Sequence, residues 1–385
     1  MKPAIDIIGA DGCTGCFGCF NSCPSDAITM KISPEGFYVP TIDRERCTEC
    51  GLCQKYCPVI FVDEPLEEEY SPKCFAAWCM DEQTRLESSS GGIFTSLATK
   101  VISSGGTVFG AAWNSVLLVE HIGVEAIDSL CSLRGSKYLQ SSIGRSFIEA
   151  ANLLEKGKPV LFSGTPCQIA AMKIFAESDL LITVDVICHG VPSITAFQKY
   201  LELRSNKRKV SKVNFRDKRT GWSKFSIVIE FDDSSIYTRR FTFDDFCWGF
   251  NNNYYLNNVC YECPFSRLPR RSDITLGDFW GAPKDLRDDK GLSVAIINTT
   301  KGEALFDDVS KIQKIPVSLD MIAKGNPRLI DGEQRHPRLR EMLLKELSNN
   351  DFGYIARKYL KHPGEFESFL KGVIYRLLRK LKMKR

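Results

Sequence analysis

The chain has 385 residues, of which 43% are hydrophobic and 25% are charged, with a formal net charge of +4. This composition is typical of a globular protein of two or three domains and excludes a mainly disordered or fibrous chain. No apolar run approaches the ~18 residues of a membrane-spanning helix. The first residues lack the pattern of a secretory signal, so we expect a cytoplasmic protein. The 16 cysteines would then be in a reducing compartment, where clustered thiols bind metal more often than they form disulfides.

Two cysteine runs of identical spacing lie within the first 60 residues. Each reads Cys-x2-Cys-x2-Cys-x3-Cys-Pro, and the second follows the first by 34 residues. This is the bacterial ferredoxin pattern, in which three thiolates of one run bind one 4Fe-4S cluster and the fourth binds the other cluster. We expect the first cluster at Cys13, Cys16, Cys19 and Cys57, and the second at Cys47, Cys50, Cys53 and Cys23. Zinc is the alternative, but a zinc site needs only four ligands.

From about residue 74 onward, short apolar runs alternate with segments of helical periodicity. Helices are predicted at 93–102, 144–155, 167–177 and 193–203, and strands at 107–113, 159–162, 180–187, 210–215, 225–231, 236–243, 274–279 and 292–299. The early alternation of strands and helices favours an α/β core with a largely parallel sheet, whereas 225–231 and 236–243 predict an antiparallel hairpin. The fold class is therefore mixed α/β and α+β, with a small ferredoxin domain before a larger α/β domain.

Four further cysteines lie at predicted loop positions. Cys167 and Cys188 each follow a predicted strand, and Cys260 and Cys263 form another Cys-x2-Cys-Pro motif. In α/β sheets, ligands bind beyond the carboxyl ends of the strands. Four thiolates suffice for one more cubane. Zinc at Cys260 and Cys263 is an alternative, as is a nucleophilic or redox role for Cys167 or Cys188.

The remaining cysteines and histidines carry weaker signals. We predict packing roles for Cys74, Cys79, Cys131 and Cys247, which sit among apolar residues. His121 has no motif around it and is expected to be structural. His189 adjoins Cys188 at a strand end, so it would donate a hydrogen bond or a proton there, or merely orient the loop.

Cubanes pass one electron at a time. Two-electron organic chemistry therefore needs a cofactor, such as flavin, that takes part in both one-electron and two-electron transfer. The sequence has neither a Gly-x-Gly-x-x-Gly after a strand nor a Walker loop, so a flavin would be bound in another way. The Ser-Ser-Ser-Gly-Gly segment at 88–92 is the candidate phosphate site, with Thr95 one turn later. A simple helix cap is the alternative. Lys137 and Tyr138 offer a charge and a stacking ring.

Over roughly residues 5–320 the chain resembles the coenzyme F420 hydrogenase/dehydrogenase beta-subunit family. The resemblance rests on the double cysteine run followed in order by SSSGGIF, LRGSKYLQS, VLFSGTPCQIAAM, DVICHGVPS, FRDKRTGW, CYECPFS and DITLGDFWG. It implies a flavoprotein that binds FAD and a 4Fe-4S cluster in its catalytic domain, behind an N-terminal two-cluster ferredoxin module. The family includes subunits that exchange hydride with the deazaflavin coenzyme and related reductases that act on chlorophyll-type pigments, and many bacterial members of unknown substrate have the same domain order.

The resemblance also implies site residues. FAD would be lined by Ser90, Gly91, Gly92, Thr95, Lys137, Tyr138, Ser141, Thr165 and Pro166. A third 4Fe-4S cluster would be held by Cys167, Cys188, Cys260 and Cys263. The substrate face would include Arg216, Lys218, Trp222, Asp278 and Trp280. The candidate catalytic residues are His189, Lys137, Arg216 and Asp278.

The expected domains are a ferredoxin domain at 1–66, a flavin-binding catalytic domain in two parts at 72–150 and 151–325, and a helical basic tail at 326–385. The predicted function is an iron-sulfur flavoprotein oxidoreductase that passes electrons between 4Fe-4S clusters and FAD, with hydride exchange to a deazaflavin-like or other organic substrate. The alternatives are an electron-transfer subunit or adaptor without its own substrate, and a binding module with structural clusters. The partner would be a redox protein or a small-molecule electron donor or acceptor. Nucleic acid is not expected, because no basic, aromatic-studded stretch runs through the chain.

The two ends of the chain differ in charge. Residues 1–70 hold 12 acidic and 5 basic side chains, whereas residues 356–385 hold 2 acidic and 10 basic ones. Apolar residues recur every three or four positions from 366 to 381, which predicts an amphipathic helix. A basic amphipathic helix can lie on an anionic membrane, so peripheral contact with the inner face of the membrane is one hypothesis. Docking of its apolar stripe on the body is the other.

Overall fold

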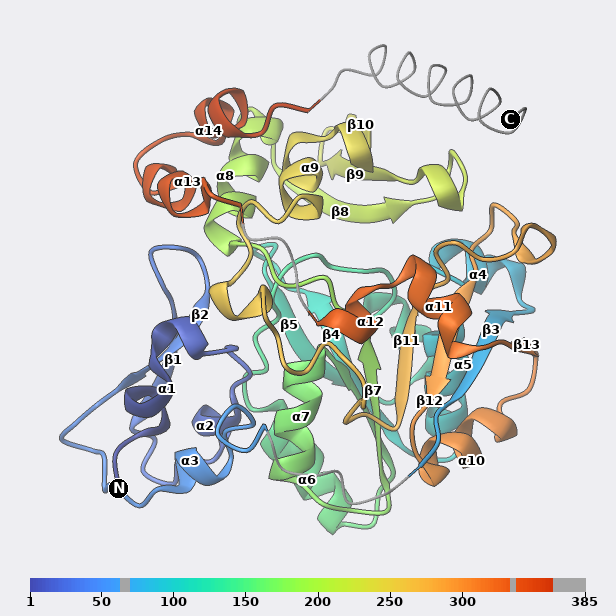
Figure 1. Ribbon diagram of the computed structural model, residues 1–385, viewed down its shortest axis with the longest axis horizontal. Coiled ribbons are helices and arrows are strands. Elements are labelled where there is room, and N and C mark those ends of the chain that lie inside the picture. Colours follow the sequence, from blue (N-terminus) through green and yellow to red (C-terminus); the bar gives the residue numbers. More distant parts are fainter. Residues whose placement is uncertain (63–69, 333–336, 363–385) are drawn as a thin grey trace, which may run out of the picture.

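The computed structural model describes residues 1–62, 70–332 and 337–362 (Figure 1). It contains a small N-terminal unit, a large sheet flanked by helices, and a three-stranded sheet with its own helices, which confirms the predicted mixed fold class (Figure 1). The amphipathic helix expected at 366–381 falls outside the described residues. Within the described ranges, no helix combines the length and apolar character needed to cross a membrane.

The N-terminal unit consists of short elements between the cysteine loops. Its elements are α1 (Ala4–Gly12), α2 (Gly18–Asn21), β1 (Ile28–Ile32), β2 (Tyr38–Ile42) and α3 (Leu52–Lys55). β1 and β2 pair antiparallel. α2 and α3 are single turns that each begin after a residue in the left-handed region, Phe17 at φ 67° and Gly51 at φ 80°. These two residues are 34 positions apart, so the backbone repeats with the same offset as the cysteines.

An eight-stranded mixed sheet forms the centre of the larger part (Figure 1). In spatial order its strands are β13 (Ile312–Pro316), β3 (Lys73–Cys79), β12 (Ser293–Ile297), β11 (Ile274–Asp278), β7 (Leu181–Val186), β6 (Val160–Gly164), β4 (Thr107–Trp113) and β5 (Val119–Val124). β11, β7, β6 and β4 run parallel, and the other neighbours pair antiparallel. The carboxyl ends of these four parallel strands therefore lie at one edge of the sheet, where α/β proteins bind ligands.

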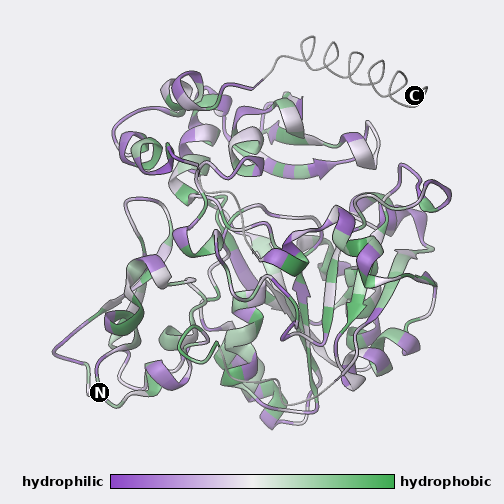
Figure 2. Cartoon of the chain, viewed as in Figure 1, coloured by the Kyte–Doolittle hydropathy of each residue, from purple (hydrophilic) through white to green (hydrophobic). Residues whose placement is uncertain are grey.

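Helices cover both faces of this sheet, because neighbouring strand residues point to opposite sides. Leu161 packs in the cluster that contains α5 (Ile93–Ser103) and α10 (Thr300–Asp308). Phe162 packs in the cluster that contains α6 (Ser146–Glu155) and α7 (Pro166–Phe175). All five residues of β12 are buried, and the middle of the sheet is mainly apolar (Figure 2). The remaining helices beside the sheet are α4 (Glu82–Glu87), α11 (Leu319–Gly325) and α12 (Arg328–Asp331).

The second sheet is antiparallel and lies beside the carboxyl end of the first (Figure 1). Its strands are β8 (Val210–Asp217), β9 (Ser226–Phe231) and β10 (Ile236–Arg240), and its helices are α8 (Ile194–Ser205), α9 (Asp245–Asn251), α13 (Arg340–Leu347) and α14 (Phe352–Tyr359). The hairpin expected from 225–231 and 236–243 is confirmed, although its second strand ends at Arg240 and continues as a 3-10 turn. An aromatic-rich core joins this sheet to its helices.

One packing prediction is wrong. Cys74, Cys79 and Cys247 are buried as expected, but Cys131 is exposed in a 3-10 turn, Ile127–Ser132. Its neighbour Leu130 is fully buried and anchors the turn. The apolar surroundings in the sequence therefore belong to Leu130, and the adjacent thiol faces solvent.

Candidate iron-sulfur and redox site

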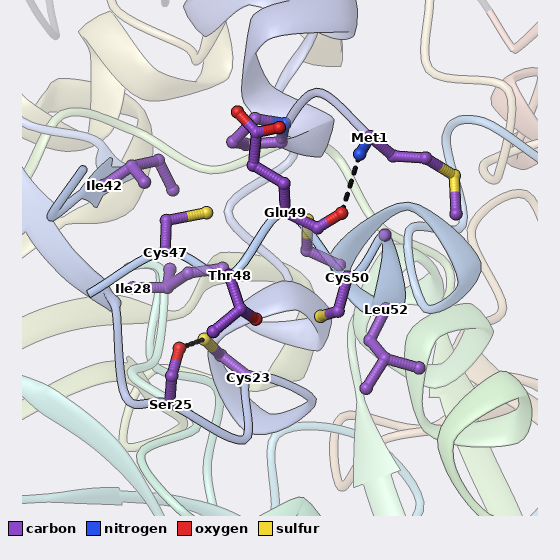
Figure 3. Close-up of a pocket in the computed structure, with 13 residues that line it drawn as sticks. Met1, Cys23, Ser25, Ile28, Ile42, Cys47, Thr48, Glu49, Cys50 and Leu52 are labelled. Atoms are coloured by element: carbon purple, nitrogen blue, oxygen red, sulfur yellow. Dashed lines mark hydrogen bonds between the residues drawn. The ribbon is translucent and has the colours of Figure 1, made fainter. Parts of the chain in front are cut away.

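Two cavities of the N-terminal unit are lined by cysteines in the crossed pattern that the spacing predicts. One cavity is lined by Cys13, Cys16, Cys19 and Cys57, and the other by Cys23, Cys47, Cys50 and Cys53. We call these the inner set and the outer set. Each contains three thiols from one run and the last thiol of the other run. In the outer set, the thiols of Cys23, Cys47 and Cys50 point toward a common space (Figure 3).

Local backbone features hold the thiols of these two sets. Gly15 has a φ of 61°, and a Cβ there would meet the Tyr38 carbonyl oxygen at 2.7 Å, so only glycine fits this turn. Its amide donates to the Cys13 sulfur at 3.4 Å, and the Ala4 amide donates to the Cys53 sulfur at 3.4 Å. Such amide–sulfur bonds orient thiolate ligands and stabilise their charge.

Burial disfavours free thiolates in the inner set. It raises the pKa of Cys13 to about 11 and that of Cys16 to about 12, and it raises the pKa of Cys19 as well. The charges of neighbouring cysteines raise all three further. A metal cluster removes this penalty, because coordination deprotonates the thiol and neutralises its charge. Four converging buried thiols therefore fit a 4Fe-4S cluster in chemistry and number.

The later cysteines also come together, from three separate loops. Cys167 lies in the first turn of α7, Cys188 follows β7, and Cys260 ends a 3-10 turn, Asn258–Cys260, just before Cys263. Burial raises the pKa values of Cys167, Cys188 and Cys260, and the charge of Cys263 raises each of them further. We call these four residues the third set.

The backbone brings the loops of the third set into contact. Pro192 and Leu256 form an isolated antiparallel bridge, and the Asn257 amide donates to the Val191 carbonyl at 2.9 Å. A Cβ on Gly190 would lie 3.2 Å from the Cβ of Cys260. The loop after β7 therefore needs glycine at position 190 to approach the Cys-x2-Cys motif this closely.

The three sets form a row. The charge of Cys53 in the outer set acts on Cys19 of the inner set, and the charge of Cys16 in the inner set acts on Cys167 of the third set. Among the described residues, no three His, Cys, Asp or Glu side chains converge tightly enough to hold a single metal ion. A cubane needs a wider arrangement, since each of its thiolates binds a different iron.

The inner set lies where the N-terminal unit meets the large sheet. Gln140 donates Nε2 to the carbonyls of Thr14 at 2.8 Å and Gly15 at 3.0 Å. Asn257 donates Nδ2 to the Cys13 carbonyl at 3.3 Å. The outer set is at the other end of the unit, and its Cys50 is the exposed member. The inner set therefore lies between the body and the exposed Cys50.

Two of the four candidate catalytic residues form one buried ion pair. Arg216 donates to both carboxylate oxygens of Asp278, at 2.7 and 3.0 Å, and its side chain is only 3% exposed. Arg216 also donates to the Tyr138 hydroxyl at 3.0 Å, and the Trp222 indole donates to Asp278 at 3.0 Å. The rings of Trp222 and Trp280 stack with centroids 4.9 Å apart. The structure thus gathers the residues predicted for the substrate face.

Lys137 and His189 lie apart from this ion pair. Lys137 donates Nζ to the carbonyls of Ser132 at 3.0 Å and Arg134 at 2.8 Å, and burial lowers its pKa to about 7. His189 lies beside the third set, where burial and the charge of Arg328 lower its pKa to about 4. The centroid of its ring lies 4.9 Å from that of Phe250, and the Phe250 ring also contacts Tyr138, with centroids 5.1 Å apart. Phe250 therefore connects the third set with the ion pair.

The Ser-Gly segment is largely engaged by the protein itself. The Gly91 amide donates to Ser293 Oγ at 2.8 Å, and the Gly91 carbonyl accepts from the Cys79 amide at 2.7 Å. Lys218 donates Nζ to the Ser90 carbonyl at 2.8 Å, and burial lowers the pKa of Lys218 to about 7. An anion at this corner would rely on the amides of the first turn of α5, which starts after Gly92 and contains Thr95.

The other candidate flavin residues form a separate group at the start of α7. Gln168 accepts from the Thr165 amide at 3.0 Å and donates to the Ser141 carbonyl and hydroxyl at 3.1 Å each. Pro166 follows as the first residue of the helix. The sequence interpretation missed Gln168, although a Gln three residues after a Thr is the signature of a capping box.

His121 belongs to the same region and is a buried core residue. Its ring stacks on Phe162 with centroids 5.4 Å apart, and Nε2 lies 2.7 Å from the Ser163 carbonyl oxygen. Nδ1 is buried without a hydrogen-bond partner among the described residues. Burial lowers the pKa of His121 to about 4.

This histidine is expected to make the fold acid-sensitive. The unfolded chain binds a proton near the ordinary pKa of 6.5, but the folded chain binds it only near 4. Stability is therefore present above pH 6.5 and is lost as the pH falls toward 4. Between pH 7 and pH 5, wild type should lose about 2 kcal/mol more than His121→Gln, by urea unfolding. Equal losses in the two proteins would contradict the neutral buried state.

Comparisons with known proteins give two family matches. Residues 157–319 match the family described as the C terminus of the coenzyme F420 hydrogenase/dehydrogenase beta subunit, and residues 12–60 match the 4Fe-4S dicluster domain. A solved structure of the F420-reducing NiFe hydrogenase complex from Methanosarcina barkeri is similar, with 18% identity, a TM-score of 0.49, and coverage of 73% of this chain and 95% of that chain. No curated protein matches the sequence.

Proposed function

We propose that this chain is an iron-sulfur flavoprotein oxidoreductase. Through residues 157–319 it belongs to the coenzyme F420 hydrogenase/dehydrogenase beta-subunit family, and residues 12–60 form a 4Fe-4S dicluster domain. It passes electrons between 4Fe-4S clusters and FAD, and it exchanges hydride with a deazaflavin-like or other organic substrate. The domain pair itself combines an oxidoreductase family with an iron-sulfur electron-transfer module.

The observation that carries the proposal is the row of three cysteine sets that leads from the exposed Cys50 into the body. The outer set interacts with the inner set through Cys53 and Cys19, and the inner set interacts with the third set through Cys16 and Cys167. A protein with purely structural clusters would have no need for such a row from the surface to a buried ionic site.

Each residue group has a definite task in this proposal. Bound clusters supply one-electron transfer, and bound FAD supplies the exchange between one-electron and two-electron chemistry. Hydrogen bonds from backbone amides to the sulfurs hold the thiols in position, and burial excludes water from them. The buried pair Arg216–Asp278, braced by Tyr138 and Trp222, offers a rigid polar wall for an organic substrate. Lys218, with its lowered pKa of about 7, lies beside that wall and can hold or release a proton near neutral pH.

Anaerobic purification followed by iron, sulfide and flavin quantification tests the proposal. Three cubanes and one flavin predict about twelve irons, about twelve sulfides and one FAD per chain. About eight irons without flavin would leave only the ferredoxin part of the proposal standing. Reduced protein mixed with oxidised coenzyme F420 would then show whether the substrate is a deazaflavin, through loss of the deazaflavin absorbance.

The second candidate is an electron-transfer subunit that serves a partner enzyme without a substrate of its own. The exposure of Cys50 at the end of the row favours it, because a partner protein can approach the outer set directly. Anaerobic reduction of candidate acceptors, with and without a partner, separates the two. Reduction that occurs only with a partner supports the subunit role.

A further inference from the structure

Two buried arginines lie beside the third set. Arg328, in α12, donates Nη2 to the Cys260 carbonyl, and Arg270 donates Nη2 to the Asp185 carboxylate at 2.8 Å. Arg328 is 7% exposed, and the Arg270 side chain is fully buried. Arg270 also donates Nη2 to the Val186 carbonyl at 2.8 Å, two residues before Cys188.

The two arginines differ in how their charge is compensated. Arg270 forms an ion pair with the buried carboxylate of Asp185. Arg328 makes no ion pair with any described residue, and its Nε and Nη1 are buried without a hydrogen-bond partner there. An uncompensated buried cation is costly unless negative charge lies beside it. Four thiolates on a cubane would supply that negative charge.

The backbone of the inner set has different bonding partners. Gln140 and Asn257, which are neutral amides, donate to the carbonyls of Thr14, Gly15 and Cys13. At the third set, a buried guanidinium donates to the Cys260 carbonyl. Reduction adds one negative charge to a cluster, and a buried cation stabilises the reduced form more than the oxidised form.

We propose that Arg328 is a positioning residue that raises the reduction potential of the third cluster above the potential of the cluster in the inner set. This inference rests on the proposed function and gives it a direction: electrons run from Cys50 inward. A low-potential one-electron donor reduces the ferredoxin part. One electron then leaves the cluster of the inner set and arrives at the cluster of the third set, so that one is oxidised as the other is reduced. No bond forms or breaks.

The test is a redox titration of the anaerobically purified full chain, followed by electron paramagnetic resonance. Arg328→Gln should disfavour reduction of the third cluster at least tenfold, which for one electron lowers its midpoint potential by about 59 mV or more. The two ferredoxin signals should stay unchanged. Arg328→Lys keeps the charge and should restore most of the potential. Arg267→Gln removes an exposed arginine near Cys263 and should shift nothing, because water screens its charge.

The outcomes separate this inference from the proposed function. A wild-type chain with about eight irons overturns the proposed three-cluster function. About twelve irons with no shift in Arg328→Gln overturns only the role of Arg328. If Arg328→Gln fails to hold the third cluster, the wild-type titration decides. A third cluster that is reduced before the cluster of the inner set supports the proposal, and one that is reduced after it overturns the proposal.

Discussion

Cys263→Ala is expected to lower the iron content of the anaerobically purified protein from about twelve to about eight atoms per chain. The charge of Cys263 acts on all three other members of the third set, so this thiol is central to the site. Alanine offers no ligand to iron, so the cubane loses one of its four bonds to the protein, and we expect it to be lost during purification. Iron and sulfide assays measure the loss, and electron paramagnetic resonance shows which signal disappears.

Cys131→Ala is the matched control. Cys131 is also a free thiol of the larger part, but it is exposed in a 3-10 turn and is remote from the three sets in the sequence. Its replacement should leave the iron content unchanged. If Cys263→Ala retained all of the iron found in wild type, the third set would not be a ligand set, and the chain of clusters would end at the inner set.

Asp278→Asn is expected to lower the free energy of unfolding by about 3–5 kcal/mol, because it leaves the Arg216 guanidinium buried without its partner. Arg216 is 3% exposed on its side chain and Asp278 is 15% exposed, so water cannot replace the lost carboxylate. The same change leaves the Trp222 indole with a neutral amide oxygen as its acceptor in place of a carboxylate. Urea unfolding followed by tryptophan fluorescence measures the effect, and Trp222 and Trp280 lie at the site itself.

The control is Asp217→Asn in the same region. Asp217 pairs with Arg219, whose side chain is 57% exposed, so the expected loss is below about 1 kcal/mol. Similar losses in both variants would contradict the assignment of Arg216–Asp278 as a buried, rigid pair. A stable Asp278→Asn protein that also turned over normally would remove this pair from the proposed substrate wall.

The ferredoxin part was predictable because its ligands are local. The spacing of each cysteine run matches one tight loop plus one thiol that leaves it, so the crossed sets follow from sequence arithmetic. The structure reproduces both sets as cavity linings. The structure adds that Phe17 and Gly51, 34 residues apart, are both in the left-handed region, and no sequence rule points to a phenylalanine in that conformation.

In the larger part of the chain, the sequence predicted most of the strands and helices, but it predicted less well which strands pair in the sheet. Strand β4 was expected at 107–113 and is found at Thr107–Trp113. Strands β3, β5 and β13 were not predicted. They lie at or near the ends of the sheet or carry a mixed pattern of apolar and polar residues, so their strand signal is weaker. The sheet is more antiparallel than the early strand–helix alternation predicts, since β12, β3 and β13 join it from distant parts of the chain. Pairing of such strands depends on burial and not on local pattern.

The sequence did not predict which of the candidate catalytic residues lie in the same site. Arg216 and Asp278 form one site, but Lys137 donates to a nearby turn and His189 lies beside the third set. Motif order along the chain cannot tell which motifs share a pocket. The importance of Arg328 gave no sequence signal at all, because it depends on a carbonyl and on thiols that are 65 or more positions away.

The sequence by itself determined which sulfurs belong to the two ferredoxin sets, and which segments form most of the strands and helices, because these depend on spacing over a few residues. Only the tertiary structure decided that the thiols of three distant loops meet, that they meet next to the inner set, and that a buried arginine faces them. Those facts depend on how strands from distant parts of the chain are ordered in one sheet, and that order follows from the packing of whole faces.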